Sequence, residues 1–183
     1  MKYRPDFPNR HVEIVEYDDR WPAMFATERT ALRAVLPTAE SIEHIGSTSI
    51  PGIPAKPTID ILAVVPGLED ARASVKPLAA LGYQLRSKAF EDDDHHLFFR
   101  KVKHRQRTHH LHVVAEPSTA GDEYRLLREY LVARPDVAAQ YGRAKLEFAA
   151  RHPNDRRAYL DDKHAFVEDL MSEARRWQAA SQR

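Results

Sequence analysis

The amino-acid sequence predicts an α/β fold of the α+β kind, in which a mixed β-sheet has flanking helices and a C-terminal helical cap. Two observations carry this prediction. Short apolar or alternating segments precede Gly121, and helical patterns follow it. The length of 183 residues and the hydrophobic content of 43% fit one compact domain with a core of its own. We therefore expect a single domain over residues 1–183.

The predicted strands are short segments with a strand-like hydrophobic pattern. Val12–Tyr17 alternates apolar and polar residues as a half-buried strand does, and Ile59–Val65 is apolar enough to lie at the centre of a sheet. The predicted strands are, in chain order, Val12–Tyr17, Ser41–Ile45, Ile59–Val65, Tyr83–Arg86, Leu97–Val102 and His110–Ala115. Two charged spans, Glu91–His96 and Lys103–Arg107, are predicted to be exposed turns.

The predicted helices are marked by start and stop signals. Acidic residues and Pro22 mark the start of a helix that ends near Val35. Gly82 closes another helix over Leu68–Leu81, which Pro77 should shorten or kink. The predicted helices of the C-terminal cap are Asp122–Ala133, Pro135–Arg151 and Asn154–Gln178, followed by a fraying segment, Ala179–Arg183.

Composition excludes several classes of protein. The 28 Lys and Arg residues balance 27 Asp and Glu residues, so no global charge points to a nucleic acid or to an anionic membrane. The absence of Cys excludes disulfides, thiolate metal sites and cysteine nucleophiles. No segment approaches the ~20 apolar residues of a membrane span, so we expect a cytoplasmic protein without a membrane partner.

A basic stretch near the predicted fifth strand is the one local feature that suits RNA or a polyphosphate. The stretch comprises Arg100, Lys101, Lys103, Arg105 and Arg107. Its neighbouring aromatic residues, Phe98 and Phe99, fit a hydrophobic core, and further stacking aromatics are missing. The sequence therefore argues against a nucleic-acid partner.

The clearest motif is the run His44–Ser49, whose sequence is His-Ile-Gly-Ser-Thr-Ser. It forms a hydroxyl-rich turn after one predicted strand, and Asp60 enters the next strand about a dozen residues later. This arrangement suits phosphates held beside a metal ion. An acid at the mouth of an apolar strand is costly unless a metal ion or a cation accompanies it, and Lys56 and Arg100 are alternative partners for it.

The residues of this turn have two interpretations. Gly46 permits a close approach of the backbone, while the following hydroxyls and amides offer groups that hold a triphosphate or another anion. The alternative is that the hydroxyls satisfy local backbone groups. The candidate phosphate-binding residues here are Gly46, Ser47, Thr48, Ser49 and Lys56.

Taken together with its flanks, this motif resembles the GrpB family of the nucleotidyltransferase superfamily. Three further blocks share the resemblance, namely Arg107–Val114, Leu127–Leu131, and Tyr159 with Lys163 and Phe166. The resemblance covers about residues 12–170, which we take as the core of the domain. It implies a nucleotidyltransferase-like fold in which Asp60 holds a divalent metal such as Mg²⁺ and helps to position the attacking hydroxyl. Some members of the family resemble fusions to dephospho-CoA kinases.

The chain departs from the superfamily pattern at the acids. Many active members carry a second acid two residues after the first, where this chain has Leu62, and a third acid on a later strand, where it has His110-Leu111-His112. Two-metal catalysis is therefore in doubt.

The histidines suggest a substitute for the missing acids. Side chains two residues apart on a strand share a face, so His110 and His112 should point together, with Asp60 and His44 nearby. Such a site suits Mn²⁺, Zn²⁺ or Fe²⁺ better than Mg²⁺, and either histidine of the pair could serve as a general base. The alternative is that these histidines are hydrogen-bonded structural groups.

The last two predicted helices repeat one spacing of side chains. Tyr141, Lys145 and Phe148 fall at i, i+4 and i+7, and Tyr159, Lys163 and Phe166 do the same, so each lysine lies on the face expected to be buried. Such a lysine either reaches solvent or an acid, or binds an anionic substrate. The candidate substrate-binding residues of the cap are Arg128, Tyr141, Lys145, Tyr159 and Lys163.

These features predict a metal-dependent nucleotidyltransferase that moves a nucleotidyl group from an NTP to a small-molecule or protein acceptor. The candidate catalytic residues are Asp60, His110 and His112, and the candidate metal ligands are Asp60, His110, His112 and His44. Two alternatives remain. One is a catalytically degenerate module that binds a nucleotide or a CoA precursor, which Leu62 favours, and the other is a metal-dependent phosphohydrolase.

Overall fold

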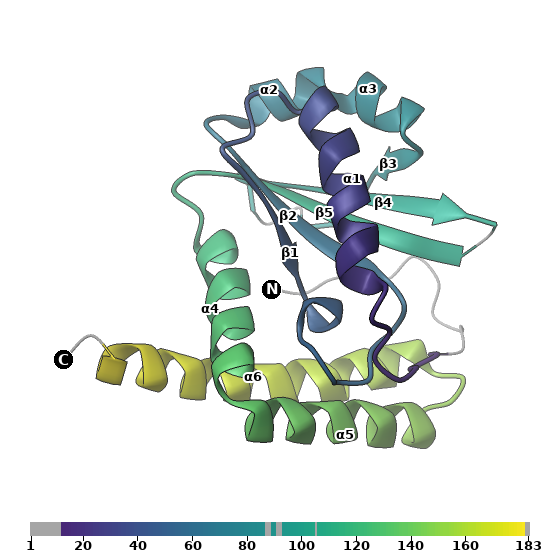
Figure 1. Ribbon diagram of the computed structural model, residues 1–183, viewed down its shortest axis with the longest axis vertical. Coiled ribbons are helices and arrows are strands. Elements are labelled where there is room, and N and C mark those ends of the chain that lie inside the picture. Colours follow the sequence, from purple (N-terminus) through teal and green to yellow (C-terminus); the bar gives the residue numbers. More distant parts are fainter. Residues whose placement is uncertain (1–11, 87–88, 91–92, 105, 182–183) are drawn as a thin grey trace.

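A computed structural model describes residues 12–86, 89–90, 93–104 and 106–181. Its centre is a five-stranded sheet with the order β1-β2-β5-β4-β3 (Figure 1). The strands are β1 (Ser41–Ile45), β2 (Ile59–Val65), β3 (Tyr83–Leu85), β4 (His96–Lys103) and β5 (Gln106–Ala115). Because β2 runs parallel to β5 and the other neighbouring pairs are antiparallel, the predicted mixed sheet is confirmed.

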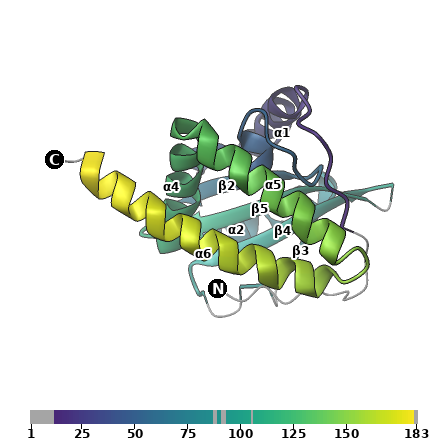
Figure 2. The same cartoon turned by 90° about the horizontal axis from the view of Figure 1, so that it is seen from below.

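Helices lie on both sides of this sheet. The helices α1 (Trp21–Val35), α2 (Leu68–Ala73) and α3 (Val75–Ala80) cover one face (Figure 1). The cap helices are α4 (Thr119–Ala133), α5 (Pro135–Arg151) and α6 (Arg156–Ser181). Figure 2 shows α5 and α6 side by side across the sheet, on the side away from α1. No helix in the part of the chain that the structure describes combines the length and apolar character of a membrane span.

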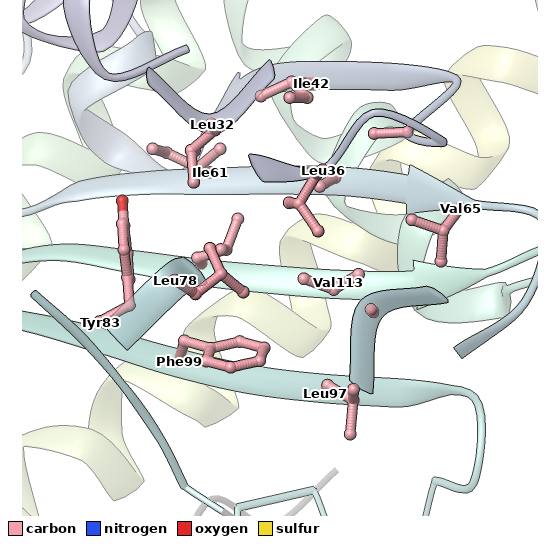
Figure 3. Close-up of a cluster of buried hydrophobic side chains, with 14 of the residues drawn as sticks. Leu32, Leu36, Ile42, Ile61, Val65, Leu78, Tyr83, Leu97, Phe99 and Val113 are labelled. Atoms are coloured by element: carbon pink, nitrogen blue, oxygen red, sulfur yellow. The ribbon is translucent and has the colours of Figure 1, made fainter. Parts of the chain in front are cut away.

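The pleat of the central strands decides which side chains reach the cap. In β2, Ile59, Ile61, Ala63 and Val65 belong to the main core beneath α1–α3. Figure 3 shows Ile61, Val113 and Phe99 from three strands of the sheet meeting Leu32 and Leu36 in this core. Because side chains alternate along a strand, Asp60, Leu62 and Val64 face the cap instead.

The prediction of a strand over Val12–Tyr17 is wrong. This segment forms only one bridge, between Val15 and Ala55, with both N–H to O=C distances at 2.9 Å. Pro54 and Pro57 flank the partner segment and lack N–H groups, so the ladder does not extend. Val12 packs instead among residues of α5 and α6.

The predicted helix over Leu68–Leu81 is broken, as Pro77 suggests. The first part, α2, ends at Ala73, and α3 begins at Val75. Pro77 has no N–H to donate to the carbonyl of Ala73, and its ring collides with that carbonyl in a continuous helix. The chain therefore starts a new helix in which Pro77 lies within the first turn.

The two predicted charged turns are shorter than expected. His96 is 4% exposed and begins β4, so its prediction as an exposed turn residue is wrong. Strand β4 extends to Lys103 and β5 starts at Gln106, so the connection between them is shorter than the predicted turn. Glu91, Asp92 and Arg105 lie outside the described residues.

The cap begins and ends beyond the predicted limits. Ser118 caps the N-terminus of α4, since its Oγ accepts a hydrogen bond from the Gly121 N–H at 3.1 Å. Helix α6 continues to Ser181 through most of the segment predicted to fray.

Candidate functional site

Asp60 and His110 form a hydrogen-bonded pair on the cap-facing side of the sheet. They are register partners in β2 and β5, and His110 Nδ1–H donates to Asp60 Oδ1 at 2.8 Å. Burial raises the pKa of Asp60, but the hydrogen bond from His110 and the nearby positive charges, including that of Lys163, outweigh it, and the net pKa is lowered. Burial lowers the pKa of His110 despite the carboxylate. The pair therefore consists of an ionised Asp60 and a neutral His110.

The free side of the His110 ring faces inward. Its Nε2 is buried and has no hydrogen-bond partner among the described residues. Since Nδ1 carries the proton, Nε2 presents a lone pair, which suits a metal ion or a proton donor from a ligand.

The Gly46–Ser49 turn lies directly against Asp60. Gly46 has φ +70°, and a Cβ at this position would lie 2.5 Å from Asp60 Oδ2. The turn forms a short 3₁₀ helix over Ser47–Ser49. The structure thus brings together the glycine turn and the acid, which lie on either side of the loop that connects β1 to β2.

The hydroxyls of the turn serve mainly local contacts. Thr48 is fully buried, and its Oγ1 lies 2.9 Å from His44 Nε2 and donates to the Thr58 carbonyl at 3.3 Å. Ser49 Oγ donates to the Gly46 carbonyl at 2.6 Å. The predicted phosphate contacts by these two hydroxyls are therefore not supported, while Ser47 makes no side-chain hydrogen bond to other described residues.

His44 lies on the opposite face of the sheet from Asp60. Its register partner is Ile61, and its ring stacks on Phe25 of α1 with centroids 4.8 Å apart. Burial lowers the pKa of His44 to about 4. The prediction that His44 and Asp60 share a metal is not supported, because Ile45 rather than His44 pairs with Asp60.

His112 belongs to a buried aromatic cluster rather than to the Asp60 pair. Its Nδ1 lies 3.0 Å from His96 Nε2 and 3.2 Å from the Tyr124 hydroxyl. Burial lowers the pKa of both histidines, that of His96 to about 4. Leu62, the register partner of His112, packs in an apolar cluster with Ile45.

The predicted four-ligand metal cluster is consequently not assembled. The described residues contain no group of three or more His, Cys, Asp or Glu side chains that could hold a metal ion. His96 and Tyr124 were missed as neighbours of His112, because the contacts join β4, β5 and α4. The predicted strand begins at Leu97. A strand that begins at His96, as β4 does, would have included this histidine in the alternating pattern of side chains.

A group of basic side chains surrounds Asp60 from the loop, the hairpin and the cap. Their charges act on one another or on Asp60, which places them in one electrostatic neighbourhood. The group consists of Lys56, Arg107, Lys145, Arg156 and Lys163. Burial, together with the positive charges of Arg156 and Arg107, lowers the pKa of Lys56 to about 8.

Lys145 is the most deeply buried member of this basic group. It is 1% exposed, and its Nζ has no hydrogen-bond partner among the described residues. The Nζ lies 4.4 Å from the centroid of the Tyr141 ring. Burial and the charge of Lys163 lower the pKa of Lys145 to about 7. The prediction that this lysine lies on the buried face of its helix is confirmed.

Lys163 and the two tyrosines complete the cap side of the site. Tyr141 and Tyr159 are 3% and 6% exposed, and Tyr141 stacks on Phe166 between α5 and α6. Tyr141 raises the pKa of Lys163 more than burial lowers it, so this lysine stays charged. The side chains of the two helices therefore come together in one region, where the charges of Lys145 and Lys163 act on each other and on Asp60.

Arg128 is engaged by the sheet instead of facing this region freely. Its guanidinium donates to the His44 carbonyl at 3.0 Å and to Glu43 Oε2 at 3.1 Å. Arg125 donates to the other oxygen of Glu43 at 2.9 Å. These bonds tie α4 to β1, so the prediction that Arg128 contacts the substrate is not supported.

The GrpB protein family matches residues 11–173 of the chain. The chain belongs to the GrpB family. A UPF0157 protein of Pseudomonas aeruginosa is 38% identical over 89% of the chain and 67% of its own length. A UPF0157 protein of Bacillus subtilis is 34% identical over 93% of the chain and 49% of its own length, so the chain spans about half of that relative.

Solved structures agree with this family assignment. The crystal structure of conserved protein GrpB from Enterococcus faecalis superposes with a TM-score of 0.82 at 31% identity, over 88% of the chain and 96% of that protein. The MgGTP-bound Cid1 poly(U) polymerase superposes with a TM-score of 0.51 at 16% identity, over 75% of the chain and 45% of the polymerase. The fold is therefore nucleotidyltransferase-like.

Proposed function

We propose that this protein binds a nucleoside triphosphate between the Gly46–Ser49 turn and the lysines of α5 and α6, and transfers the nucleotidyl group to a small-molecule or protein acceptor. The observation that carries the proposal is the group of buried and half-buried basic side chains whose charges act on one another beside Asp60. Cations gathered away from solvent are costly, and an anionic ligand offsets that cost. The nucleotidyltransferase-like fold supports a triphosphate as that anion.

Each group has a role in this scheme. The backbone of the Gly46 turn and the hydroxyl of Ser47 contact phosphate oxygens, while Lys56, Lys145 and Lys163 neutralise them. His110 is neutral, and its Nε2 lone pair accepts the proton of the attacking group.

The residues fit one divalent ion better than two. Leu62 and His112 occupy the positions where further acids would stand, and both are engaged in packing. Mg²⁺ often binds through one or two carboxylates together with substrate phosphates. Asp60 would hold such an ion; if the ion is Mn²⁺ or Zn²⁺, His110 Nε2 would be a second ligand in place of its role as proton acceptor. A bound ion supplies charge neutralisation at the phosphates.

A binding module is the second candidate function. The superfamily carries acids at three positions of this face. Here Leu62 and His112 stand at two of them, and only Asp60 is an acid. A site that keeps its cations and loses its acids still binds a nucleotide or a CoA precursor. Product formation, rather than binding, separates the two functions.

The first test compares the native protein with D60N. We expect calorimetric titration with the four NTPs, each with Mg²⁺, Mn²⁺ or Zn²⁺, to show binding that D60N weakens at least about tenfold, since one lost charge-assisted contact is worth ~1.5–3 kcal/mol. D169N changes an exposed acid of α6 and should bind as the native protein does. Labelled nucleotide should then appear on an acceptor in a cell extract. Binding without any labelled product supports the binding module, and no binding with any pair contradicts both functions.

A further inference from the structure

Lys145 is a buried amine that makes no ion pair with a described carboxylate. It is 1% exposed, and its Nζ has no hydrogen-bond partner among the described residues. The face of the Tyr141 ring at 4.4 Å offers a weak attraction for a cation. A charged ammonium group in this position loses most of its hydration, so burial disfavours the charged form.

The charged groups that act on Lys145 have opposing effects, and the balance favours the uncharged amine. Lys163 of α6 is positive and repels a second charge, while burial raises the pKa of the neighbouring Tyr159 phenol, so it offers no negative charge near pH 7. Asp60 of β2 attracts the ammonium form, but its effect is smaller than burial and Lys163 together. The resulting pKa of about 7 agrees with the geometry. Lys163 differs, because Tyr141 raises its pKa and it remains protonated.

We propose that Lys145 is a proton-linked phosphate contact, which is uncharged before the ligand binds and takes up a proton from solvent when a phosphate oxygen of the ligand reaches Nζ. The inference rests on the proposed function, since that function brings phosphates to this region. The neutral amine and one proton become an ammonium group that donates to the phosphate oxygen, and no other bond changes. The site therefore selects ligands with ionised phosphates and not the uncharged nucleoside.

Calorimetry measures this proton uptake directly. Sodium tripolyphosphate and MgATP are titrated at pH 8 in two buffers with different ionisation enthalpies, and the difference in apparent heat gives the number of protons bound. We expect the native protein to take up close to one proton more than K145M, and the difference to shrink at pH 6, where the amine is already protonated. Adenosine should show no proton uptake.

K163M is the matched control. Both K145M and K163M should weaken tripolyphosphate binding about tenfold or more, because each removes a buried charge-assisted contact. Only K145M should abolish the linked proton, since Lys163 is charged before the ligand arrives. Equal proton uptake in the native protein and K145M would overturn the inference.

The ligand-free protein gives an independent readout. A lysine whose folded pKa is below its unfolded value destabilises most at low pH, and the penalty declines as pH rises above the folded pKa. K145M should therefore raise the urea midpoint relative to the native protein at pH 6, with a smaller gain at pH 9. A gain that is absent or independent of pH contradicts an uncharged buried amine.

The outcomes separate the inference from the proposed function. Nucleotide binding without proton uptake overturns the inference and leaves the proposed function standing. Proton-linked tripolyphosphate binding without any nucleotidyl transfer overturns the transferase function and leaves the inference standing. If neither ligand binds at any tested pH, both are overturned.

Discussion

At the scale of single residues, the site depends on how closely Gly46 approaches Asp60. The backbone at Gly46 has φ +70°, a conformation that residues other than glycine rarely adopt. A Cβ here would also lie 2.9 Å from Asp60 Cβ and 3.0 Å from Asp60 Cγ. The glycine thus serves two needs at once, because it allows the turn and leaves room for the carboxylate.

G46A should damage both stability and ligand binding. We expect a loss of about 2–4 kcal/mol in the free energy of unfolding, from backbone strain together with overpacking. Nucleotide affinity should fall at least tenfold, because Asp60 must move.

G52A is the matched control, since Gly52 has φ +78° but no atom within 4 Å of an added Cβ. It should cost only about 1–2 kcal/mol and leave binding unchanged. Urea denaturation and calorimetry test both variants, and similar binding by G46A and G52A would contradict the role given to Asp60.

At the scale of elements, α5 is positioned by its contact with the loop that follows the turn. Gly142 lies inside α5, and a Cβ there would meet Pro54 Cδ at 2.9 Å and Ile53 Cβ at 3.5 Å. The loop therefore packs directly on the helix backbone. Lys145 follows Gly142 by three residues, so this contact decides how close the lysine comes to the sheet.

G142A should destabilise the protein although alanine favours helices. The gain in helix propensity is about 1 kcal/mol, while the collision with the Pro54 ring costs about 1–3 kcal/mol. We expect a small net loss of stability and weaker tripolyphosphate binding, because α5 shifts away from the sheet. The double variant P54A/G142A should recover the binding, and a double-mutant cycle by urea denaturation measures the coupling. Simple additivity in that cycle would contradict a direct contact.

At the scale of the whole molecule, buried histidines make the protein sensitive to acid. Burial lowers the pKa of His44 and His96 to about 4 each, and it lowers the pKa of His110 and His112 as well. The unfolded chain binds protons at these residues near its ordinary value of about 6.5. Since the unfolded state then binds more protons than the folded state, stability falls as pH drops from about 6.5 towards 4.

The free energy of unfolding should drop by about 3–5 kcal/mol between pH 7 and pH 4.5 from His44 and His96 alone. Urea denaturation of the metal-free protein, with a chelator present, measures this at both pH values. H96N removes one of these titrating groups and should show a smaller drop than the native protein. A native stability that is flat over this range would show that the histidines are not held neutral.

Local patterns in the sequence determined a large share of the fold and named the acid, the turn and the lysines of the site. Strands were predicted at the observed limits of β1 and β2, the second from its apolar character, and the helical spacing placed Lys145 on a buried face. These features are local, because a strand or helix presents its side chains with a period set by its own backbone.

Only the tertiary structure decided which of the candidates meet. The register of β1 on β2 turns His44 to the far face, the contact of α4 with β1 engages Arg128 with Glu43, and β4 brings His96 to His112. These outcomes depend on pairings between segments distant in the chain, and a shift of one residue in a strand register moves every side chain to the other face. The same packing leaves Lys145 Nζ without a hydrogen-bond partner among the described residues, which no spacing along the chain could predict.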